Sequence, residues 1–288
     1  MLNRVIGVMK RFYWAMVRSE RYHSLMARIA VTDHIDRLQG QYRGTKRLEP
    51  HGFKVYSQAD EDGIIQEIFI RIGTTDRRFI EVGAHDGSEN CTAYLLHQGW
   101  SGLWLDAGEN TQTVARHWPK ESASGQVKFQ AALIDPDNVN PVFEKAGVTG
   151  EIDLLVFDID GNDYHVLKRL TAVKPRVICL EYNAHFPPPY RWVMPYNPAH
   201  HFDGSHVFGA SLSAYDDLMR ERGYTLVGCC LTGANAFFVR SDLTQDKFAE
   251  PATPEHLYQP PRFYLAYQPF GMRYGFSAGR SPPQLWKP

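Results

Sequence analysis

Two clusters of acidic and amide side chains each follow an apolar segment of the kind that forms a buried parallel strand. The segments are predicted strands over residues 152–157 and 176–180, and the side chains that follow them are Asp158, Asp160, Glu181 and Asn183. Because ligands of an open parallel sheet bind beyond the carboxyl ends of its strands, we expect these side chains to meet in one crevice. Oxygen ligands favour Mg²⁺ or Mn²⁺ over Zn²⁺, so all four are candidate metal ligands. The alternative is that Asp158 caps the next helix and Glu181 pairs with an arginine.

A third candidate site is the glycine turn FIEVGAHDG at residues 79–87. Gly83 and Gly87 allow the backbone to turn sharply after a strand and to approach a ligand without an intervening Cβ. Glu81 and Asp86 bring negative charge, which repels the pyrophosphate of a dinucleotide but suits the ammonium and sulfonium groups of S-adenosylmethionine. The turn therefore predicts S-adenosylmethionine as the cofactor; the alternative is an ordinary glycine turn after a buried strand.

Further cofactor contacts are predicted along the same edge. Asp106 ends the second predicted strand about 20 residues after the glycine turn, where nucleotide-binding folds hydrogen-bond ribose hydroxyls. Asp135 follows the third predicted strand and could face the adenine, although turn chemistry explains it equally well. Ser57 and Gln58 lead through a predicted helix into the glycine strand, so we expect them to lie over the cofactor. For Asp106, the alternative is a simple loop acid.

The apolar periodicity predicts one doubly wound α/β domain over residues 51–245, with a mostly parallel seven-stranded sheet. Its last two strands, residues 224–229 and 236–240, are predicted to form an antiparallel hairpin, which mixed sheets often carry at one end. The other predicted strands are those that end at the glycine turn, at the ribose-binding acid and at the acidic clusters described above. The main predicted helices lie within residues 56–73, where Ser57 precedes the helix, and over residues 90–98 and 208–223.

A proline-rich, aromatic segment at residues 186–206 interrupts the regular pattern. Loops of this kind commonly carry function, so we expect it to bind the acceptor, with a packed surface loop as the alternative. His185 beside it is the first candidate for a catalytic base, because imidazole titrates near neutral pH, and Asp160 is the second catalytic candidate. His165 and His206 are weaker candidates.

The ends of the chain differ from its centre in composition. Residues 1–47 hold ten Lys or Arg against three Asp or Glu, a net charge of +7, which leaves −8 for the remainder. The basic amphipathic pattern of residues 1–50 predicts a helical extension. Through residues 1–30 it either contacts a membrane surface peripherally or packs on the domain or a second subunit. The Pro- and aromatic-rich residues 246–288 are expected to pack on the domain or a partner.

Bulk properties limit the function classes. No apolar run approaches the ~18 residues of a membrane span, and the four cysteines have no metal-binding spacing. We expect a cytoplasmic protein, held peripherally at the inner membrane face if the N-terminal helix binds lipid. We also expect a homo-oligomer that binds no nucleic acid.

Seven segments in the same order resemble the FkbM-like branch of class I S-adenosylmethionine-dependent methyltransferases, over residues 56–240. They are YSQADEDGIIQEIF, FIEVGAHDGSENCTAYLL, GWSGLWLD, VFDIDGNDYHVL, EYNAHFPP, FGASLSAYDDL and GYTLVGCCLTGANAFFVR. The resemblance implies a Rossmann-like class I methyltransferase fold and methyl transfer to oxygen. The acceptor it implies is a sugar hydroxyl in a glycan, surface polysaccharide or natural product.

The resemblance also assigns residues by position. The matched positions of the first motif, the ribose acid and the acids after the fourth strand are Glu81, Gly83, Gly87, Asp106, Asp158 and Asp160. The acids after strands four and five are similar in placement to those that hold magnesium in metal-dependent O-methyltransferases of the catechol and macrolide-sugar kinds. This chain departs from the catechol pattern because Asn183 stands two residues after Glu181 rather than next to it.

The predicted reaction is an SN2 transfer in which acceptor oxygen, methyl carbon and sulfur are held in line, and orientation supplies roughly 7–11 kcal/mol in favourable cases. A divalent metal would polarise the acceptor hydroxyl. Two other classes stay open. One is a nicotinamide-dependent oxidoreductase, which the acidic glycine turn disfavours, and the other is a non-catalytic glycan-assembly subunit.

Overall fold

The computed structural model describes residues 46–263. The predicted N-terminal helix and the last part of the Pro- and aromatic-rich tail lie outside these residues. In the described part of the chain, no helix is long and apolar enough to span a membrane.

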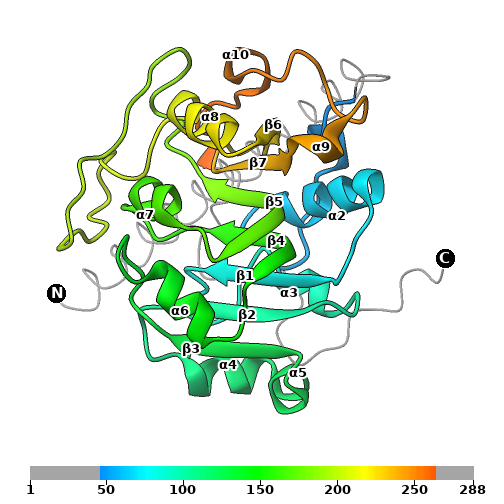
Figure 1. The fold of residues 1–288 in the computed structure, drawn as a ribbon, viewed down its shortest axis with the longest axis vertical. Coiled ribbons are helices and arrows are strands. Elements are labelled where there is room, and N and C mark those ends of the chain that lie inside the picture. The colour runs from blue at the N-terminus through cyan, green and yellow to red at the C-terminus, as the bar shows by residue number, and fades with distance from the viewer. Residues whose placement is uncertain (1–45, 264–288) are drawn as a thin grey trace, which may run out of the picture.

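A seven-stranded sheet in the order β3-β2-β1-β4-β5-β7-β6 organises the described residues. Figure 1 shows its strands stacked from β6 at the top to β3 at the bottom. The strands are β1 (Arg78–Val82), β2 (Ser101–Asp106), β3 (Val127–Ala131), β4 (Gly150–Phe157), β5 (Val173–Glu181), β6 (Tyr224–Cys229) and β7 (Asn235–Arg240). The first five strands pair in parallel, and β7 is antiparallel to both β5 and β6. The topology confirms the predicted fold, including its antiparallel terminal hairpin.

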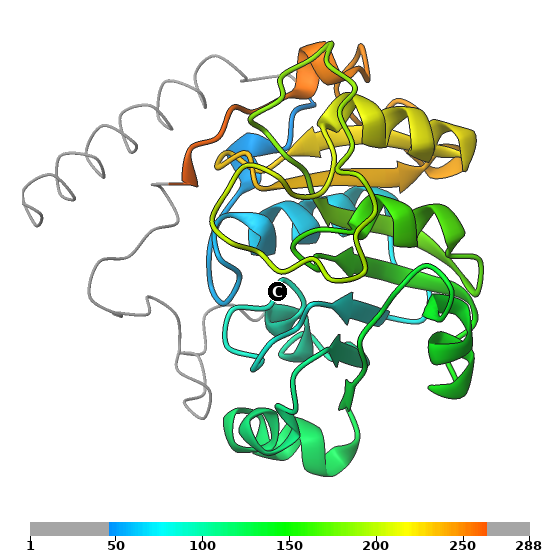
Figure 2. The same cartoon turned by 90° about the vertical axis from the view of Figure 1, so that its left-hand side faces the viewer.

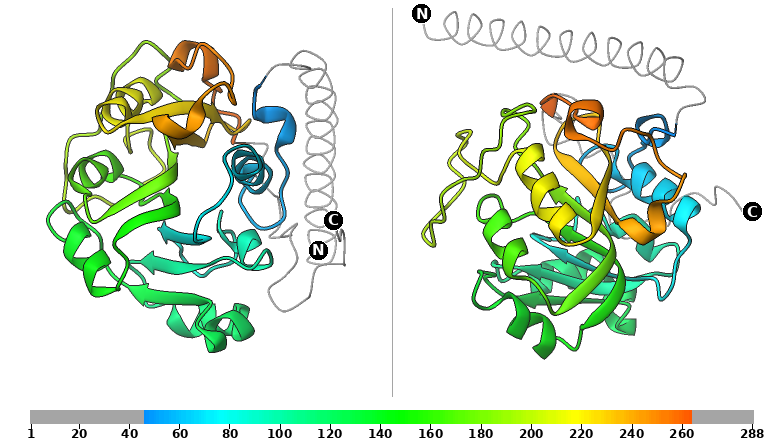
Figure 3. Two further views of the ribbon diagram at one scale, coloured as in Figure 1. Left: turned by 45° about the vertical axis from the view of Figure 1, so that its right-hand side comes forward. Right: turned by 45° about the horizontal axis from the view of Figure 1, so that its top comes forward.

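Helices cover both faces of this sheet, as Figure 3 shows. They are α2 (Glu61–Ile72), α3 (Ala93–Leu96), α4 (Thr111–His117), α5 (Pro119–Ser124), α6 (Val139–Lys145), α7 (Asp163–Arg169), α8 (Leu212–Glu221), α9 (Ser241–Thr244) and α10 (Pro254–Leu257), with a short 3-10 helix η1 (Glu49–His51) before them. Apolar side chains of α2, α3 and α4 pack with those of one sheet face, and those of α6, α7, α8 and α10 with the other. Each strand therefore alternates its side chains between two buried layers.

The predicted helix after Ser57 begins later than expected. Asp62 Oδ2 accepts the backbone N–H groups of Val55, Tyr56 and Ser57, at 2.6, 2.7 and 3.1 Å. These bonds hold residues 55–57 as a loop, so α2 begins at Glu61. A local side-chain bond to the backbone has here displaced the first helical turn.

Two other predicted elements also have different bounds. The helix expected over residues 208–223 spans only Leu212–Glu221, because Ser211 caps it by accepting the N–H of Ala214. The strand expected to begin at Arg176 begins at Val173 and includes Pro175. Proline has no N–H to donate, but the β5–β7 ladder starts only at Val177, so Pro175 lies outside that ladder.

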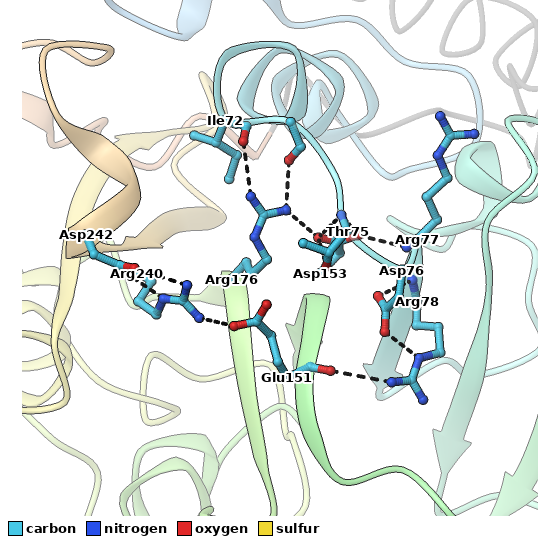
Figure 4. Close-up of polar contacts among 11 residues, drawn as sticks. Ile72, Thr75, Asp76, Arg77, Arg78, Glu151, Asp153, Arg176, Arg240 and Asp242 are labelled. Atoms are coloured by element: carbon cyan, nitrogen blue, oxygen red, sulfur yellow. Dashed lines mark hydrogen bonds and ion pairs between the residues drawn. The ribbon is translucent and has the colours of Figure 1, made fainter.

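The amino ends of the strands, opposite the predicted site, are joined by the polar network drawn in Figure 4. Arg176 lies 2.6 Å from Asp153, and both are almost fully buried. Asp153 also accepts the backbone N–H groups of Thr75 and Arg77, while Arg176 donates to the carbonyl oxygens of Ile72 and Gly73. The ion pair thus fastens the end of α2 to β4 and β5.

Candidate functional site

A cavity of about 730 Å³ opens beyond the carboxyl ends of the parallel strands. Its wall is acidic: the carboxylates that line it are Glu81, Asp86, Glu89, Asp106, Asp135, Asp158, Asp160 and Glu181. Within residues 46–263, no Lys or Arg side chain lines this cavity. The volume suits a cofactor-sized ligand, and the charge suits a cation.

Gly83 is required by the contact between β1 and β4. Its φ is +87°, and an added Cβ would lie 1.6 Å from the backbone oxygen of Asp158. Gly87, with φ +80°, instead makes room for the indole rings of Trp104 and Trp118, which an added Cβ would meet at 2.9 and 3.2 Å. Gly83 therefore lines the cavity, whereas Gly87 packs beside it against the two indole rings. Their close approach to a ligand stays a prediction.

Glu81 lines the cavity but has its own structural contacts. Its carboxylate accepts the N–H groups of Cys91 and Thr92, at 2.9 and 3.2 Å, and the Thr92 hydroxyl at 2.5 Å. Burial raises the pKa of this carboxyl, and these hydrogen bonds oppose the shift. Glu81 thus ties the segment before α3 to the end of β1.

Asp106 is placed as the sequence predicts. It ends β2, lines the cavity and is half-buried. Oδ2 accepts the N–H of His85 at 2.9 Å, and Oδ1 accepts the N–H of Gly108 at 2.7 Å. Each carboxylate oxygen has two lone-pair directions, so the oriented group can accept further hydrogen bonds from hydroxyls in the cavity.

The other predicted cofactor residues divide into two groups. Gln58 and Asp135 line the cavity, beside the exposed Leu133. Asp135 also accepts the N–H groups of Asp137 and Asn138, both at 2.8 Å, which is the predicted turn chemistry. Ser57 is fully buried, bonds to Asp62 and is not among the lining residues, so it does not lie over the cavity as predicted.

Asp158, Asp160 and Glu181 come together as predicted. One carboxylate oxygen from each lies within 4.8 Å of the others. Burial first, and then the neighbouring acids, raises the pKa of both Asp158 and Glu181 well above the usual range. Their oxygen-only chemistry fits a hard divalent cation.

The loop that carries these acids is held by Asp163. This buried residue accepts the N–H groups of Ile159 and Gly161, both at 2.8 Å. Asp160 between them has φ +56°, a left-handed conformation that costs a residue with a Cβ about 1–2 kcal/mol. Asp163 therefore holds the loop before α7, whose N-cap residue Asn162 makes no side-chain cap bond, and Asp158 faces the cavity rather than capping the helix.

Asn183 differs from the prediction. It is fully buried, and its amide donates to the backbone oxygens of His206 and Phe208, at 2.9 and 3.0 Å. Its Oδ1 accepts the N–H of His185 at 3.2 Å. The chain has left the sheet after Glu181, so Asn183 fastens the end of the acceptor loop and does not join the acids.

The predicted histidine base is also outside the cavity wall. The ring centroids of His185 and His206 are 3.9 Å apart, and burial, followed by the charge of His206, lowers the pKa of His185. His165 Nε2 lies 2.7 Å from the backbone oxygen of Met194. The histidine of this loop that lines the cavity is His200, which the sequence analysis missed.

Residues 186–206 reach the cavity through Tyr196, Pro198 and His200. Figure 2 shows this yellow-green loop in front of the sheet. Asn235, at the start of β7, is a second lining residue that was not predicted. The histidines and tyrosines of the loop could have indicated His200 from the sequence. Asn235 is a single asparagine in an apolar strand, and no sequence pattern indicates its position at the cavity.

No protein-family model and no curated protein matches the chain. Among solved structures, it is similar to magnesium protoporphyrin IX methyltransferase from Synechocystis with bound S-adenosylmethionine. That similarity has 12% identity and a TM-score of 0.43, over 64% of this chain and 79% of that one. The N-terminal domain of EvdMO1 with bound S-adenosylhomocysteine has 16% identity and a TM-score of 0.39, over 71% and 94%. The 1,6-didemethyltoxoflavin-N1-methyltransferase of Burkholderia thailandensis has 14% identity and a TM-score of 0.40, over 62% and 76%.

Proposed function

We propose that this chain is an S-adenosylmethionine-dependent O-methyltransferase. The observation that carries the proposal is the charge of the cavity: eight carboxylates line it, without a Lys or Arg from residues 46–263. A dinucleotide would bring its pyrophosphate against these acids, whereas S-adenosylmethionine brings an ammonium and a sulfonium. The same contrast disfavours the nicotinamide-dependent oxidoreductase.

The cofactor's parts can be matched to the lining residues by chemistry. Asp106, oriented by His85 and Gly108, is suited to the two ribose hydroxyls. The exposed apolar side chain of Leu133, next to Asp135, is suited to the adenine. The acids near Glu81 and Asp158 are suited to the cationic methionine end.

The transfer itself requires the acceptor oxygen to face the methyl carbon and to lose its proton. Asp160, already a candidate from the sequence, lines the cavity together with His200, so these two residues are the proposed groups for taking that proton, with His200 in place of His185. Burial raises the pKa of Asp160, which makes its carboxylate a stronger base.

The acid group fits a metal ion by its chemistry, because Asp158, Asp160 and Glu181 offer converging oxygens. These three residues would hold Mg²⁺ or Mn²⁺, which would act as a Lewis acid on the acceptor hydroxyl. Metal dependence is therefore a separate question from cofactor binding.

We propose a sugar hydroxyl as the acceptor. Two features support this class: the likeness of residues 56–240 to FkbM-like methyltransferases, and the exposed Tyr196 at the cavity wall. An aromatic face beside hydrogen-bonding groups suits a ring with one apolar face and several hydroxyls.

Calorimetric titration tests the cofactor. Wild type, Asp106→Ala and the exposed-acid control Asp137→Ala are titrated with S-adenosylmethionine, and with NAD for comparison. We expect micromolar S-adenosylmethionine binding in wild type and Asp137→Ala, at least tenfold weaker binding in Asp106→Ala, and no NAD binding. Absence of S-adenosylmethionine binding to wild type would overturn the proposal. Turnover on a panel of sugars, with EDTA or Mg²⁺, then tests the acceptor and the metal.

A further inference from the structure

A second group of possible metal ligands lies apart from the acids that follow β4 and β5. It consists of Asp60, Glu61 and Cys230, and one ligand atom from each lies within 4.8 Å of the others. The two acids stand at the beginning of α2, whereas the cysteine follows β6 in the turn that leads to β7. Because Asp60 and Cys230 are far apart in the chain, the spacing of the cysteines gave no sign of this group.

Asp60 has the position of a helix cap without the bond of one. It is the N-cap residue of α2, where an aspartate normally accepts an N–H of the first turn, yet it makes no such bond. Its Oδ2 instead accepts the N–H of Leu231 at 3.0 Å, which directs the carboxyl toward the β6–β7 turn. Its Oδ1 is buried and has no hydrogen-bond partner among the described residues. A buried carboxylate oxygen without a partner is costly, and a bound cation would remove that cost.

The charges of Asp60 and Glu61 are not balanced by a protein cation. Within residues 46–263, no Lys, Arg or His forms an ion pair with either acid. Glu61 is fully buried, and its oxygens accept the amide of Asn235 at 3.0 Å and the N–H of Ala59 at 2.8 Å. Each of these oxygens has a second lone-pair direction, so Glu61 can also bind an ion. A divalent cation would therefore relieve the repulsion between two neighbouring buried acids.

The thiol of Cys230 adds a soft ligand to the two acids. Its sulfur is fully buried, accepts the N–H of Asn235 at 3.0 Å and lies 3.0 Å from the hydroxyl oxygen of Thr232. Hydrogen-bond donors beside the sulfur favour the thiolate, which is the form that binds metals. The neighbouring Cys229 packs in the opposite apolar layer of the sheet. One thiolate with two carboxylates is a ligand set that favours Zn²⁺ over Mg²⁺.

We propose that Asp60, Glu61 and Cys230 bind Zn²⁺. On binding, the Cys230 thiol releases its proton to solvent, and the thiolate sulfur and one oxygen of each carboxylate bond to the ion. The ion fastens the beginning of α2 to the β6–β7 turn. This site is separate from the acids of the cavity, and the inference does not depend on the proposed function.

Co²⁺ is the probe, because it takes the place of Zn²⁺ in such sites and absorbs in the near ultraviolet when it is bonded to a thiolate. The reduced full chain is freed of metal with a chelator, the chelator is removed, and Co²⁺ is titrated in. We expect one equivalent to produce the thiolate-to-cobalt band and one equivalent of Zn²⁺ to abolish it. Ions bound by Asp158, Asp160 and Glu181 add nothing to this band, because those side chains offer only oxygen.

Three variants locate the site. Cys230→Ala should lose the band, whereas Cys229→Ala, which removes the adjacent buried thiol, should keep it. Asp60→Asn keeps the thiol but should weaken Co²⁺ binding at least tenfold. Urea unfolding checks the fold of each variant, and Zn²⁺ should raise the midpoint of wild type and Cys229→Ala but not that of Cys230→Ala.

Three results would each overturn the Zn²⁺ site. They are a wild type without the band, a band that persists in Cys230→Ala, and Co²⁺ affinity in Asp60→Asn within twofold of wild type. If Cys230→Ala fails to fold, Asp60→Asn decides the question. S-adenosylmethionine titration of the same wild-type sample tests the methyltransferase proposal separately, so failure of either proposal leaves the other standing.

Discussion

The Nε2 atom of His200 lies 3.0 Å from the backbone oxygen of Asp160. The ring occupies the space over Gly161, where an added Cβ would lie 2.2 Å from its Cδ2. Asn162 and Asn197 add a reciprocal pair of bonds at 2.8 and 3.2 Å. The predicted acceptor loop is thus fastened to the acidic loop that follows β4.

This contact predicts the effect of His200→Ala. Loss of the hydrogen bond and the ring should release the loop and remove a proposed proton acceptor. We expect kcat for methyl transfer to fall at least tenfold, about 1.4 kcal/mol in the barrier, with S-adenosylmethionine affinity changed less than twofold. His201→Ala, at the exposed neighbouring position, should have no effect on either quantity. Equal kcat values for the two variants would contradict a role for His200.

Gly83→Ala should destabilise the fold. The substitution places a Cβ 1.6 Å from Asp158 oxygen at a φ of +87°. Left-handed backbone costs about 1–2 kcal/mol and overpacking about 1–3 kcal/mol, so we expect a loss of roughly 3 kcal/mol or more. Gly125→Ala is the control, because its φ is +75° but nothing lies within 4 Å of an added Cβ. Urea unfolding should show a clearly smaller loss for Gly125→Ala; equal losses would mean that the strand contact is unimportant.

The buried carboxyl of Asp62 should make stability depend on pH. Burial raises its pKa from 3.8 to about 6 in the folded chain, opposed by its hydrogen bonds to Tyr56, Val55 and Ser57. Between these values the unfolded chain releases the proton while the folded chain keeps it. This contribution to stability is therefore complete below pH 3.8 and is lost as pH rises through about 6.

Asp62→Asn removes that titration. The free energy of unfolding of the variant should fall less than that of wild type between pH 4 and 6, by up to roughly 3 kcal/mol. Denaturant unfolding across this range measures the difference, with the exposed Asp137→Asn as control. If the unfolding free energies of wild type and Asp62→Asn differ by the same amount at every pH in this range, Asp62 is ionised in the folded chain.

The Asp153–Arg176 pair predicts a large loss of stability in Arg176→Ala. Removing the guanidinium leaves the fully buried Asp153 without its charge partner, which typically costs about 3–5 kcal/mol. The exposed pair of Arg78 and Asp76 is the matched comparison, and Arg78→Ala should cost below about 1 kcal/mol. Similar midpoints of urea unfolding for the two variants would show that Asp153 is sufficiently held by its bonds to Thr75 and Arg77.

Several parts of the site follow from local sequence. The apolar strands and the residues that end them place Asp106, Asp158 and Glu181 at one edge, because parallel strands of an open sheet share their carboxyl edge. The position of Gly83 follows from the same pattern, and its close contact with the backbone oxygen of Asp158 was found only in the structure.

Other assignments required the tertiary structure. Ser57 and Asn183 were predicted at the site, but their hydrogen bonds are made to Asp62 and to the end of the acceptor loop. His200 and Asn235 reach the cavity from positions 40 and 54 residues beyond Asp160 and Glu181, respectively. Chain spacing carries no information about such pairs.

The sequence by itself therefore determined the fold class, the antiparallel hairpin and the acids at the strand ends, because each depends on periodicity and on where a strand stops. Only the tertiary structure decided which amide and which histidine line the cavity with those acids. That choice depends on the path of residues 186–206 and on the β5–β7 register, which places Asn235 opposite Glu181. Long-range packing determines both the path of this loop and the strand register, and neither can be predicted from a local sequence pattern.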